Sequence, residues 1–159
     1  MTPLVDSAYN NGTGLIIILD NRTTAMTGHQ VHPGVGLTLK QDNTSVIKPE
    51  SMARAAGIKN IRVIDPYDLE GLRKALKEEL GKKELSVIIA RRECVLLDRV
   101  NSKEVYHIDD QKCIKCGNCL DLGCPAIELF EGTYRINPIL CVSCGLCEKV
   151  CRKGAIAKK

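Results

Sequence analysis

The sequence of 159 residues contains no tryptophan and one phenylalanine, and its basic residues are not interleaved with aromatic ones. We therefore expect no nucleic-acid partner, although the formal net charge is +4. Long apolar runs are also lacking: the longest, residues 15–19, is far shorter than the roughly 20 residues that cross a bilayer. The N-terminus has no charged, apolar and small segments in the order of a secretory signal. The sequence thus predicts a cytoplasmic protein with no membrane partner.

Cysteine, in contrast, is abundant, and eight of the nine cysteines follow residue 112. The first three of each group of four recur at one constant offset, which indicates an internal duplication. A disulfide framework would require an oxidising compartment, and zinc sites use paired C-x-x-C knuckles rather than a third cysteine two residues later. Iron-sulfur cubes, in which each iron takes one thiolate, fit better, with a purely structural role for them as an open alternative. The groups are Cys113, Cys116, Cys119 and Cys124, then Cys141, Cys144, Cys147 and Cys151.

This spacing resembles that of bacterial two-cluster ferredoxins, in which the fourth cysteine of each run ligates the other cluster. The sequence departs from this pattern at two points. Arg152 follows Cys151 where proline is usual, and four residues instead of three separate Cys119 from Cys124. The resemblance implies two [4Fe-4S] clusters with crossed ligands. Cluster one would take Cys113, Cys116, Cys119 and Cys151, and cluster two would take Cys141, Cys144, Cys147 and Cys124.

The first hundred residues alternate helix and strand signals. Apolar runs at 14–21, 60–65, 85–92 and 94–97 predict buried strands, the first of them central in its sheet. Helices are expected at 2–9, at 49–56 and after a cap at Asp65 or Asp68, the last with a leucine stripe that includes Leu80. This order predicts right-handed crossovers in a parallel α/β layer. The loop 22–48 is long enough to suggest a functional role.

Two domains follow from this pattern: an α/β domain at 1–98 and a small α+β ferredoxin-like domain at 105–159, joined by a polar linker at 99–104. The second domain is expected to have short strands at 105–108, 126–130 and 133–136. The ninth cysteine, Cys94, has apolar neighbours and is expected to be a buried core thiol.

Four segments carry a wider resemblance: IILDNRTTAMTGHQVHPGVG, VIDPYDLEGLRKAL, SVIIARRECVLL and the run CxxCGxCLxLGCPAI. In this order they resemble the C-terminal part of the alpha subunit of indolepyruvate:ferredoxin oxidoreductase, over essentially the whole chain. The resemblance implies that residues 1–98 are part of a thiamine diphosphate-binding sheet. It also implies an anaerobic enzyme that converts an aryl 2-oxoacid and coenzyme A into an aryl-acetyl-CoA, carbon dioxide and reduced ferredoxin. The implied partners are a beta subunit and external ferredoxin.

The resemblance further implies a set of cofactor residues after the first strand. Asn21 and the backbone oxygen of Thr23 would bind Mg²⁺, which prefers oxygen ligands and substrate phosphates. The diphosphate would lie along Thr24, Thr27 and Gly28, and His29 is the candidate acid-base group, ahead of His32.

The Gly-Asp half of the magnesium motif is not in this sequence, nor is the domain for the aminopyrimidine ring. Cofactor binding is therefore expected only with the N-terminal remainder of the alpha subunit, or a separate chain that supplies it. A sheet without its first strands would also expose an edge and an apolar face. The alternative hypothesis is a non-catalytic electron carrier, in which residues 1–98 serve as a docking module.

Overall fold

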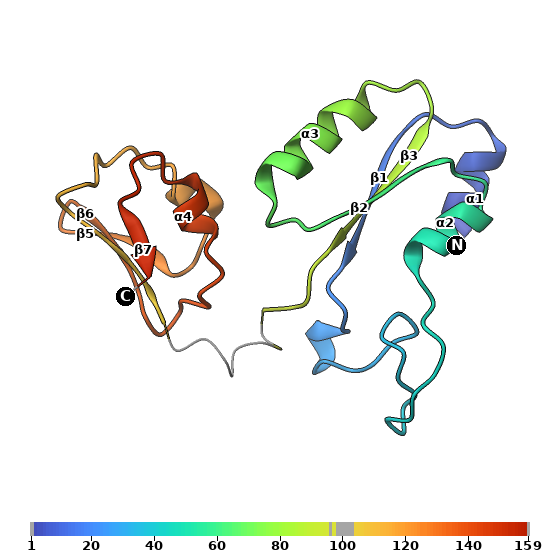
Figure 1. The fold of residues 1–159 in the computed structure, drawn as a ribbon, viewed down its shortest axis with the longest axis horizontal. Coiled ribbons are helices and arrows are strands. Elements are labelled where there is room, and N and C mark those ends of the chain that lie inside the picture. The colour runs from blue at the N-terminus through green and yellow to red at the C-terminus, as the bar shows by residue number, and fades with distance from the viewer. Residues whose placement is uncertain (1, 96, 98–103, 159) are drawn as a thin grey trace. The chain divides into compact units, whose positions relative to one another are not determined.

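The computed structural model describes residues 2–95, 97 and 104–158. The chain divides into two compact units, Met1–Cys94 and Val95–Lys159, and each is described by itself (Figure 1). The predicted linker at 99–104 lies outside the described residues except for Glu104. Within the described part of the chain, no helix is both long and apolar enough to span a bilayer.

The first unit is built on a three-stranded parallel sheet in the order β1-β3-β2. The central strand β3 is the most buried of the three, and Val87, Ile88 and Ile89 in it are fully buried. The predicted α/β class and all of its helices are confirmed. The elements are α1 (Thr2–Tyr9), β1 (Gly14–Asp20), η1 (Ala25–Thr27), α2 (Pro49–Ala55), β2 (Asn60–Ile64), α3 (Leu69–Leu80) and β3 (Leu85–Arg91).

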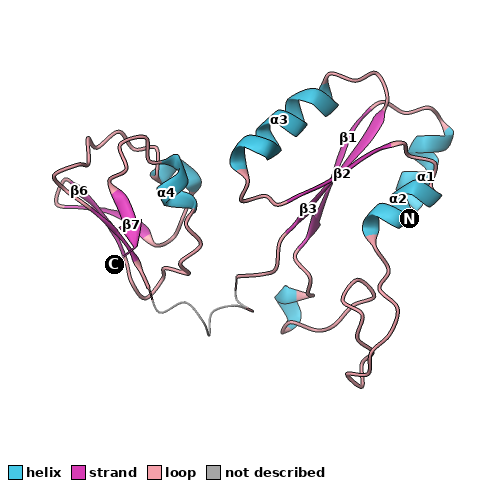
Figure 2. Ribbon diagram, viewed as in Figure 1, coloured by secondary structure: helices cyan, strands magenta, loops and turns pink. Residues whose placement is uncertain are grey.

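Helices cover both faces of this sheet, with α1 and α2 on one side and α3 on the other (Figures 1 and 2). On the first face, Ala53 of α2 packs with Ile58, Val87 and Ile89, and the partly buried side chains of Ile16 and Ile18 join them. On the other face, Asp68 precedes α3, and its Oδ1 accepts a hydrogen bond from the Gly71 N–H at 3.0 Å. Asp68, and not Asp65, is therefore the cap of this helix.

Three details of the prediction are wrong. Strand β1 lies at an edge of the described sheet and not at its centre, and Leu19 in it is 80% exposed. The buried residues of α3 are Ala75 and Glu79, whereas Leu80 at the end of the expected stripe is exposed. Residues 94, 95 and 97 form no strand, and Cys94 is half-buried because its loop runs along the surface, tied by its N–H to the Asn21 carbonyl at 3.0 Å.

The second unit is a small α+β fold with two antiparallel strand pairs. The first pair is β4 (Tyr106–Ile108) with β7 (Ile156–Lys158), and the second is β5 (Ile127–Phe130) with β6 (Thr133–Ile136). Between these strands lie the 3₁₀ turn η2 (Leu120–Leu122) and helix α4 (Leu146–Val150). The three predicted strands are confirmed, but β7 and α4 were not predicted.

Sulfur atoms make up part of the core of the second unit. The buried cluster consists of Tyr106, Ile127 and Ile156 together with Cys119 and Cys147. Three further cysteines pack against that cluster as partly buried groups, namely Cys124, Cys141 and Cys151. A unit of this size has few other apolar side chains, so its stability depends on whatever its thiols bind.

Candidate functional site

Two pockets in the second unit each gather four cysteines. The first pocket, of about 350 Å³, is lined by Cys113, Cys116, Cys119 and Cys151. The second pocket, of about 260 Å³, is lined by Cys141, Cys144, Cys147 and Cys124. Each pocket therefore takes three cysteines from one run and the fourth from the other run. The structure brings together the same two groups that the crossed ligand assignment names.

The buried thiols of these pockets are held in an environment that disfavours lone thiolates. Burial, together with the neighbouring thiols of Cys144, Cys141 and Cys124, raises the pKa of Cys147 to about 11. Burial is also the largest cause that raises the pKa of Cys119, with Cys113, Cys116 and Cys151 contributing. Four thiolates would repel one another at such sites unless a cationic centre neutralised them. The donor set therefore fits a metal cluster that keeps all four sulfurs deprotonated.

Among the described residues, no three His, Cys, Asp or Glu side chains are placed to hold a metal ion together. The four sulfurs of each pocket thus do not converge on one atom. A cubane cluster binds one thiolate at each of four irons, so it does not require such convergence.

The backbone repeats its conformation around the two pockets. Lys115 and Gly117 have φ values of 55° and 80°, and Ser143 and Gly145, at the equivalent positions of the second run, have φ values of 55° and 77°. Left-handed residues alternating with right-handed ones turn successive N–H groups toward the same concave side. The N–H of Ser143 donates to Cys141 Sγ at 3.4 Å. Hydrogen bonds of this kind help to set the potential of an iron-sulfur cluster.

The duplication extends upstream of the cysteines. The Cys113 N–H donates to the Asp109 carbonyl at 2.9 Å, and the Cys141 N–H donates to the Asn137 carbonyl at 3.0 Å. The side-chain oxygens of Asp109 and Asn137 also each accept the N–H two residues further on, at 3.0 Å. Both loops therefore start from the same turn, because Asp109 precedes Cys113 by the same interval as Asn137 precedes Cys141.

Tyrosines complete the two pockets in an exchanged arrangement. Tyr134 lines the first pocket, and Tyr106, its equivalent in the first half of the duplication, lines the second. A Cβ on Gly145 would lie 2.9 Å from the Tyr106 hydroxyl, so only glycine fits there. That hydroxyl donates to Glu148 Oε2 at 3.0 Å. Burial, and after it the Glu148 carboxylate, raises the pKa of Tyr106 to about 12. Sequence reasoning missed these residues, although the constant offset of the duplication was a signal for the tyrosines.

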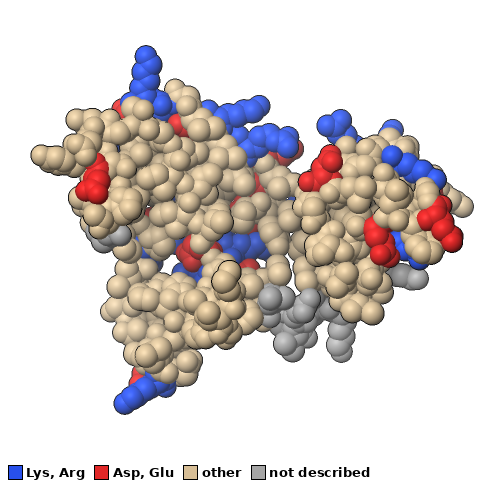
Figure 3. All heavy atoms as spheres, turned by 180° about the vertical axis from the view of Figure 1, so that it is seen from behind, with Lys and Arg blue, Asp and Glu red and all other residues tan. Residues whose placement is uncertain are grey.

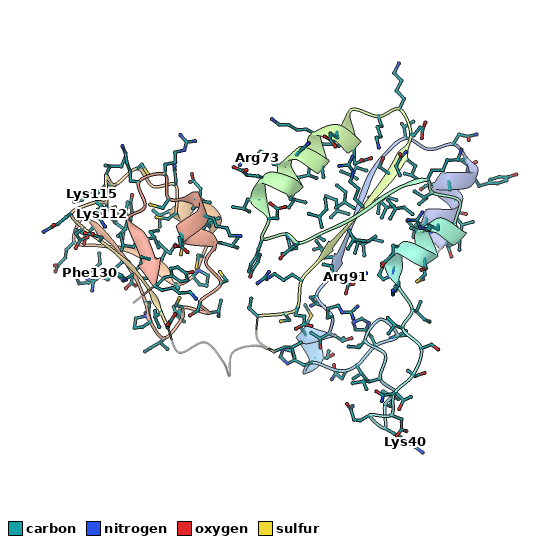
Figure 4. All side chains as sticks on the ribbon, in the orientation of Figure 1. Lys40, Arg73, Arg91, Lys112, Lys115 and Phe130 are labelled. Carbon is teal, nitrogen blue, oxygen red and sulfur yellow. The ribbon has the colours of Figure 1, made fainter. Side chains whose placement is uncertain are left out.

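In the first unit, the carboxyl edge of the sheet carries a network of charges around Arg91, which Figure 4 labels. The buried Asp20 accepts a hydrogen bond from Arg91 Nε at 2.7 Å. The two oxygens of Glu50, in the first turn of α2, accept from the same guanidinium at 3.2 and 2.6 Å. The hydrogen bond from Arg91 is the largest cause that holds the pKa of Glu50 below its usual value. Asp20 thus forms an ion pair with Arg91, and the sequence analysis did not predict this pair.

Asn21 and Thr23 share a single turn at this edge. The Asn21 Oδ1 accepts the Thr23 N–H at 3.2 Å, and the Asn21 side chain is exposed. Thr23 is buried and its hydroxyl donates to the Gln30 carbonyl at 3.4 Å. An amide oxygen has a second lone pair, so Asn21 remains able to accept a cation. Both residues lie beyond the carboxyl end of β1, and their role as magnesium ligands stays a prediction.

The remaining candidate residues lie on the loop that follows. Thr24 bridges to Gln30, and the Thr27 hydroxyl donates to Gln30 Oε1 at 2.5 Å. Gly28 has a φ of 108°, and its N–H already donates to the Ala25 carbonyl at 3.2 Å. The structure therefore brings Thr24, Thr27 and Gly28 together in one exposed turn, but it leaves the Gly28 N–H occupied within the chain.

The two histidines of this loop differ in how their nitrogens are used. His29 has a left-handed φ of 62°, and its Nε2 is buried with no hydrogen-bond partner among the described residues. His32 accepts the Gly34 N–H at its Nδ1 at 3.0 Å. His29 therefore has an uncommitted buried nitrogen and remains the better acid-base candidate of the two.

Comparison with known proteins agrees with these observations. Residues 1–90 match the family model for the thiamine pyrophosphate enzyme C-terminal TPP binding domain. Residues 134–157, which include the second cysteine run, match the model for a 4Fe-4S binding domain. The two models support thiamine diphosphate and [4Fe-4S] clusters as the cofactors. No solved structure matches this chain.

Among curated proteins, the chain is similar to indolepyruvate oxidoreductase subunit IorA of several archaea. It is 33% identical to that of Methanothermobacter thermautotrophicus over 155 residues, or 97% of this chain and 25% of the relative. It is 35% identical to that of Pyrococcus horikoshii over 98% of this chain and 25% of the relative. The chain thus spans about a quarter of the length of these relatives. The predicted resemblance is confirmed. Since the thiamine pyrophosphate model covers residues 1–90 of 159, the chain belongs to the thiamine pyrophosphate enzymes, as a C-terminal cofactor-binding domain followed by an iron-sulfur domain.

Proposed function

We propose that this chain is the electron-transferring part of the alpha subunit of an indolepyruvate-type 2-oxoacid:ferredoxin oxidoreductase, which converts an aryl 2-oxoacid and coenzyme A into an aryl-acetyl-CoA. The observation that carries the proposal is that one chain combines the carboxyl edge of a thiamine-family sheet with two four-cysteine pockets. A reaction that releases carbon dioxide and two electrons requires both a site for the carbon chemistry and acceptors for the electrons.

In this proposal each group of residues has a defined task. Thiamine diphosphate, when bound, supplies the nucleophile and the electron sink for decarboxylation. The Asn21 amide oxygen and the Thr23 carbonyl hold Mg²⁺, and Thr24, Thr27 and Gly28 form the turn beside the diphosphate. His29 Nε2 is the candidate to hold a proton near the substrate. The eight cysteines of the two pockets hold the clusters that take the electrons one at a time and pass them to external ferredoxin.

The exposed edge of β1 indicates how the half-site is completed. In the described sheet β1 pairs only with β3, so its other edge is unpaired. The side chain of Leu19, which projects from a face of the sheet, is 80% exposed. An apolar strand with a free edge readily accepts another strand. The relatives are about four times longer than this chain. We infer that the remainder of the alpha subunit, in the same polypeptide or a separate one, covers this edge, with a beta subunit completing the enzyme.

The cluster part of the proposal is tested by the iron content of anaerobically purified protein. Two cubes give about eight irons per chain. Zinc in place of iron, or no metal at all, would contradict the assignment of the two iron-sulfur clusters and with it the proposed function.

The cofactor part is tested by calorimetry with thiamine diphosphate and Mg²⁺. We expect weak binding to the chain alone and stronger binding once the remainder of the alpha subunit is added. Asn21→Ala should then abolish the gain, while Asn43→Ala, a change of the same kind in the exposed loop, should not. If iron is present but added subunit never confers cofactor binding, the chain is a non-catalytic electron carrier instead.

A further inference from the structure

The two cysteine pockets are duplicates, so residues around one can be compared with their equivalents around the other. The Cys113 run corresponds to the Cys141 run, and the crossed fourth ligands are Cys151 for the first pocket and Cys124 for the second. Where equivalent positions carry side chains of different charge or polarity, the two pockets therefore have different surroundings.

Basic residues surround the first pocket at positions where the second pocket has neutral ones. Arg152 and Lys153 line the first pocket directly after its fourth cysteine, and no carboxylate among the described residues lines it. The lining of the second pocket, over the same described residues, includes no charged side chain. In the sequence Lys115 stands between the ligands Cys113 and Cys116 of the first pocket, although it does not line the pocket, and all three cations are exposed. We call Lys115, Arg152 and Lys153 the basic rim; the equivalent residues at the second pocket are Ser143, Pro125 and Ala126.

The contrast is local and does not reflect the charge of the whole unit. Figure 3 shows Lys and Arg side chains interspersed with Asp and Glu over the surface of the second unit. Lys112, which Figure 4 labels together with Lys115, forms an ion pair with Asp109 at 3.5 Å and so contributes little net charge. Asp121 lies two residues after a ligand of the first pocket and, like Lys115, does not line the pocket, whereas Arg152 and Lys153 do.

The first pocket also brings a ligand to the surface. Cys116 is the exposed one among the cysteines, whereas its equivalent Cys144 is half-buried. Ile114, beside Cys116, is 60% exposed. An apolar centre with a charged periphery is the usual anatomy of a protein interface. The second cysteine run is preceded instead by Ile139, which is 86% exposed, and by Leu140, so its surroundings are apolar.

We propose that the first pocket is the exit for electrons and that its basic rim docks an acidic one-electron carrier protein. The proposal rests on the proposed function for the presence of the clusters. In each encounter the reduced cluster of the first pocket loses one electron and the oxidised carrier gains it. Exposed charges at the periphery accelerate association and choose the partner without forming a long-lived complex, which suits a carrier that must leave after each electron.

The test measures the affinity of the full, cluster-loaded chain for an oxidised acidic bacterial-type ferredoxin, as a function of salt. Lys115→Ser combined with Lys153→Ala replaces two rim residues by those at the equivalent positions of the second pocket. We expect the affinity at low ionic strength to fall about tenfold, and the difference from the unmodified protein to shrink as salt screens it.

A matched control removes the same net charge elsewhere. Lys74→Ser with Lys77→Ala changes two exposed lysines on α3 of the first unit, and we expect ferredoxin binding to change less than about twofold. The iron content of every variant is measured, so that loss of a cluster is distinguished from loss of docking. Equal weakening by both lysine pairs, or salt-independent binding by iron-loaded protein, would overturn the docking site alone. Protein that never holds iron would contradict the proposed function instead.

Discussion

Removing the guanidinium of Arg91 should destabilise the first unit more than any change to a surface charge. Arg91 donates one hydrogen bond to Asp20 and two to Glu50. The side chain of Asp20 is 5% exposed, so water cannot replace the lost donor. The substitution Arg91→Met keeps much of the apolar length of the side chain, and therefore isolates the loss of the charge.

The expected loss follows from the burial of Asp20 and the partial burial of Glu50. Breaking a buried ion pair by removing one partner costs about 3 to 5 kcal/mol. Arg91 and Glu50 are partly exposed, so solvent screens part of their interaction and we expect about 3 kcal/mol. With a denaturant slope of about 1.5 kcal/mol per molar urea, the unfolding midpoint would fall by about 2 M.

Helical circular dichroism in urea measures this loss, because α1, α2 and α3 all lie in the first unit. The neighbouring residue gives a matched control. Arg92 pairs with Asp65 at 2.6 Å, but its side chain is 43% exposed, so Arg92→Met should cost less than about 1 kcal/mol. Equal losses for the two arginines would refute the reasoning.

The pH dependence has a definite sign. The pKa of Glu50 is lowered in the folded protein, chiefly by Arg91. A lowered carboxylate pKa contributes stability above the unfolded value of about 4.3, and this contribution is lost as the pH falls through the folded value. The gap between the unmodified protein and Arg91→Met should therefore narrow in acid. A gap that stays constant down to a pH of about 2 would show that packing, and not charge, is responsible.

Three further predictions concern single sites. Cys151→Ser should remove the cluster of the first pocket and preserve the cluster of the second. The electron paramagnetic resonance spectrum of the reduced protein should then lose the coupling between two clusters. Loss of the second cluster instead would favour uncrossed ligands. Arg152→Ala should lower the potential of the first cluster in cyclic voltammetry, because a cation stabilises the reduced form, and an unchanged or higher potential would contradict this. Asp68→Ala should cost about 1 kcal/mol in urea unfolding, since it removes the cap of α3, and a loss near zero would rule the cap out.

Local pattern was sufficient to predict most of the fold. The aliphatic run of β3 and the proline that opens α2 determine their elements with neighbours only a few residues away. The position of β1 could not be predicted in the same way. Its run GLIIILD is as apolar as that of a central strand. An apolar run indicates that a strand is covered in the assembled protein, but it does not indicate which polypeptide covers the strand. Leu80 continues the leucine spacing of α3 but is exposed, and the neighbouring Glu79 is the buried residue at that end of the helix.

The cysteines were predictable because ligand spacing is a property of short loops. The tyrosines of the two pockets were not predicted, because each stands outside the cysteine run whose pocket it lines. Tyr106 lies against Gly145, and Tyr134 lies nearest to the position of a Cβ on Gly117, so each tyrosine serves the pocket built from the other run. The pair of Asp20 and Arg91 joins two strands that are adjacent in space, although the two residues are 71 positions apart in sequence.

The exchange of parts between the two halves has a consequence for how the unit can diverge. Because each pocket draws its fourth cysteine and its tyrosine from the other half, neither half forms a complete pocket by itself. The cysteines and tyrosines are therefore coupled across the unit, whereas Arg152 and Lys153 follow a ligand and are free to differ from Pro125 and Ala126. The two pockets can thus keep equivalent cysteines while the surfaces beside them differ in charge, as the proposed exit of electrons through the first pocket requires.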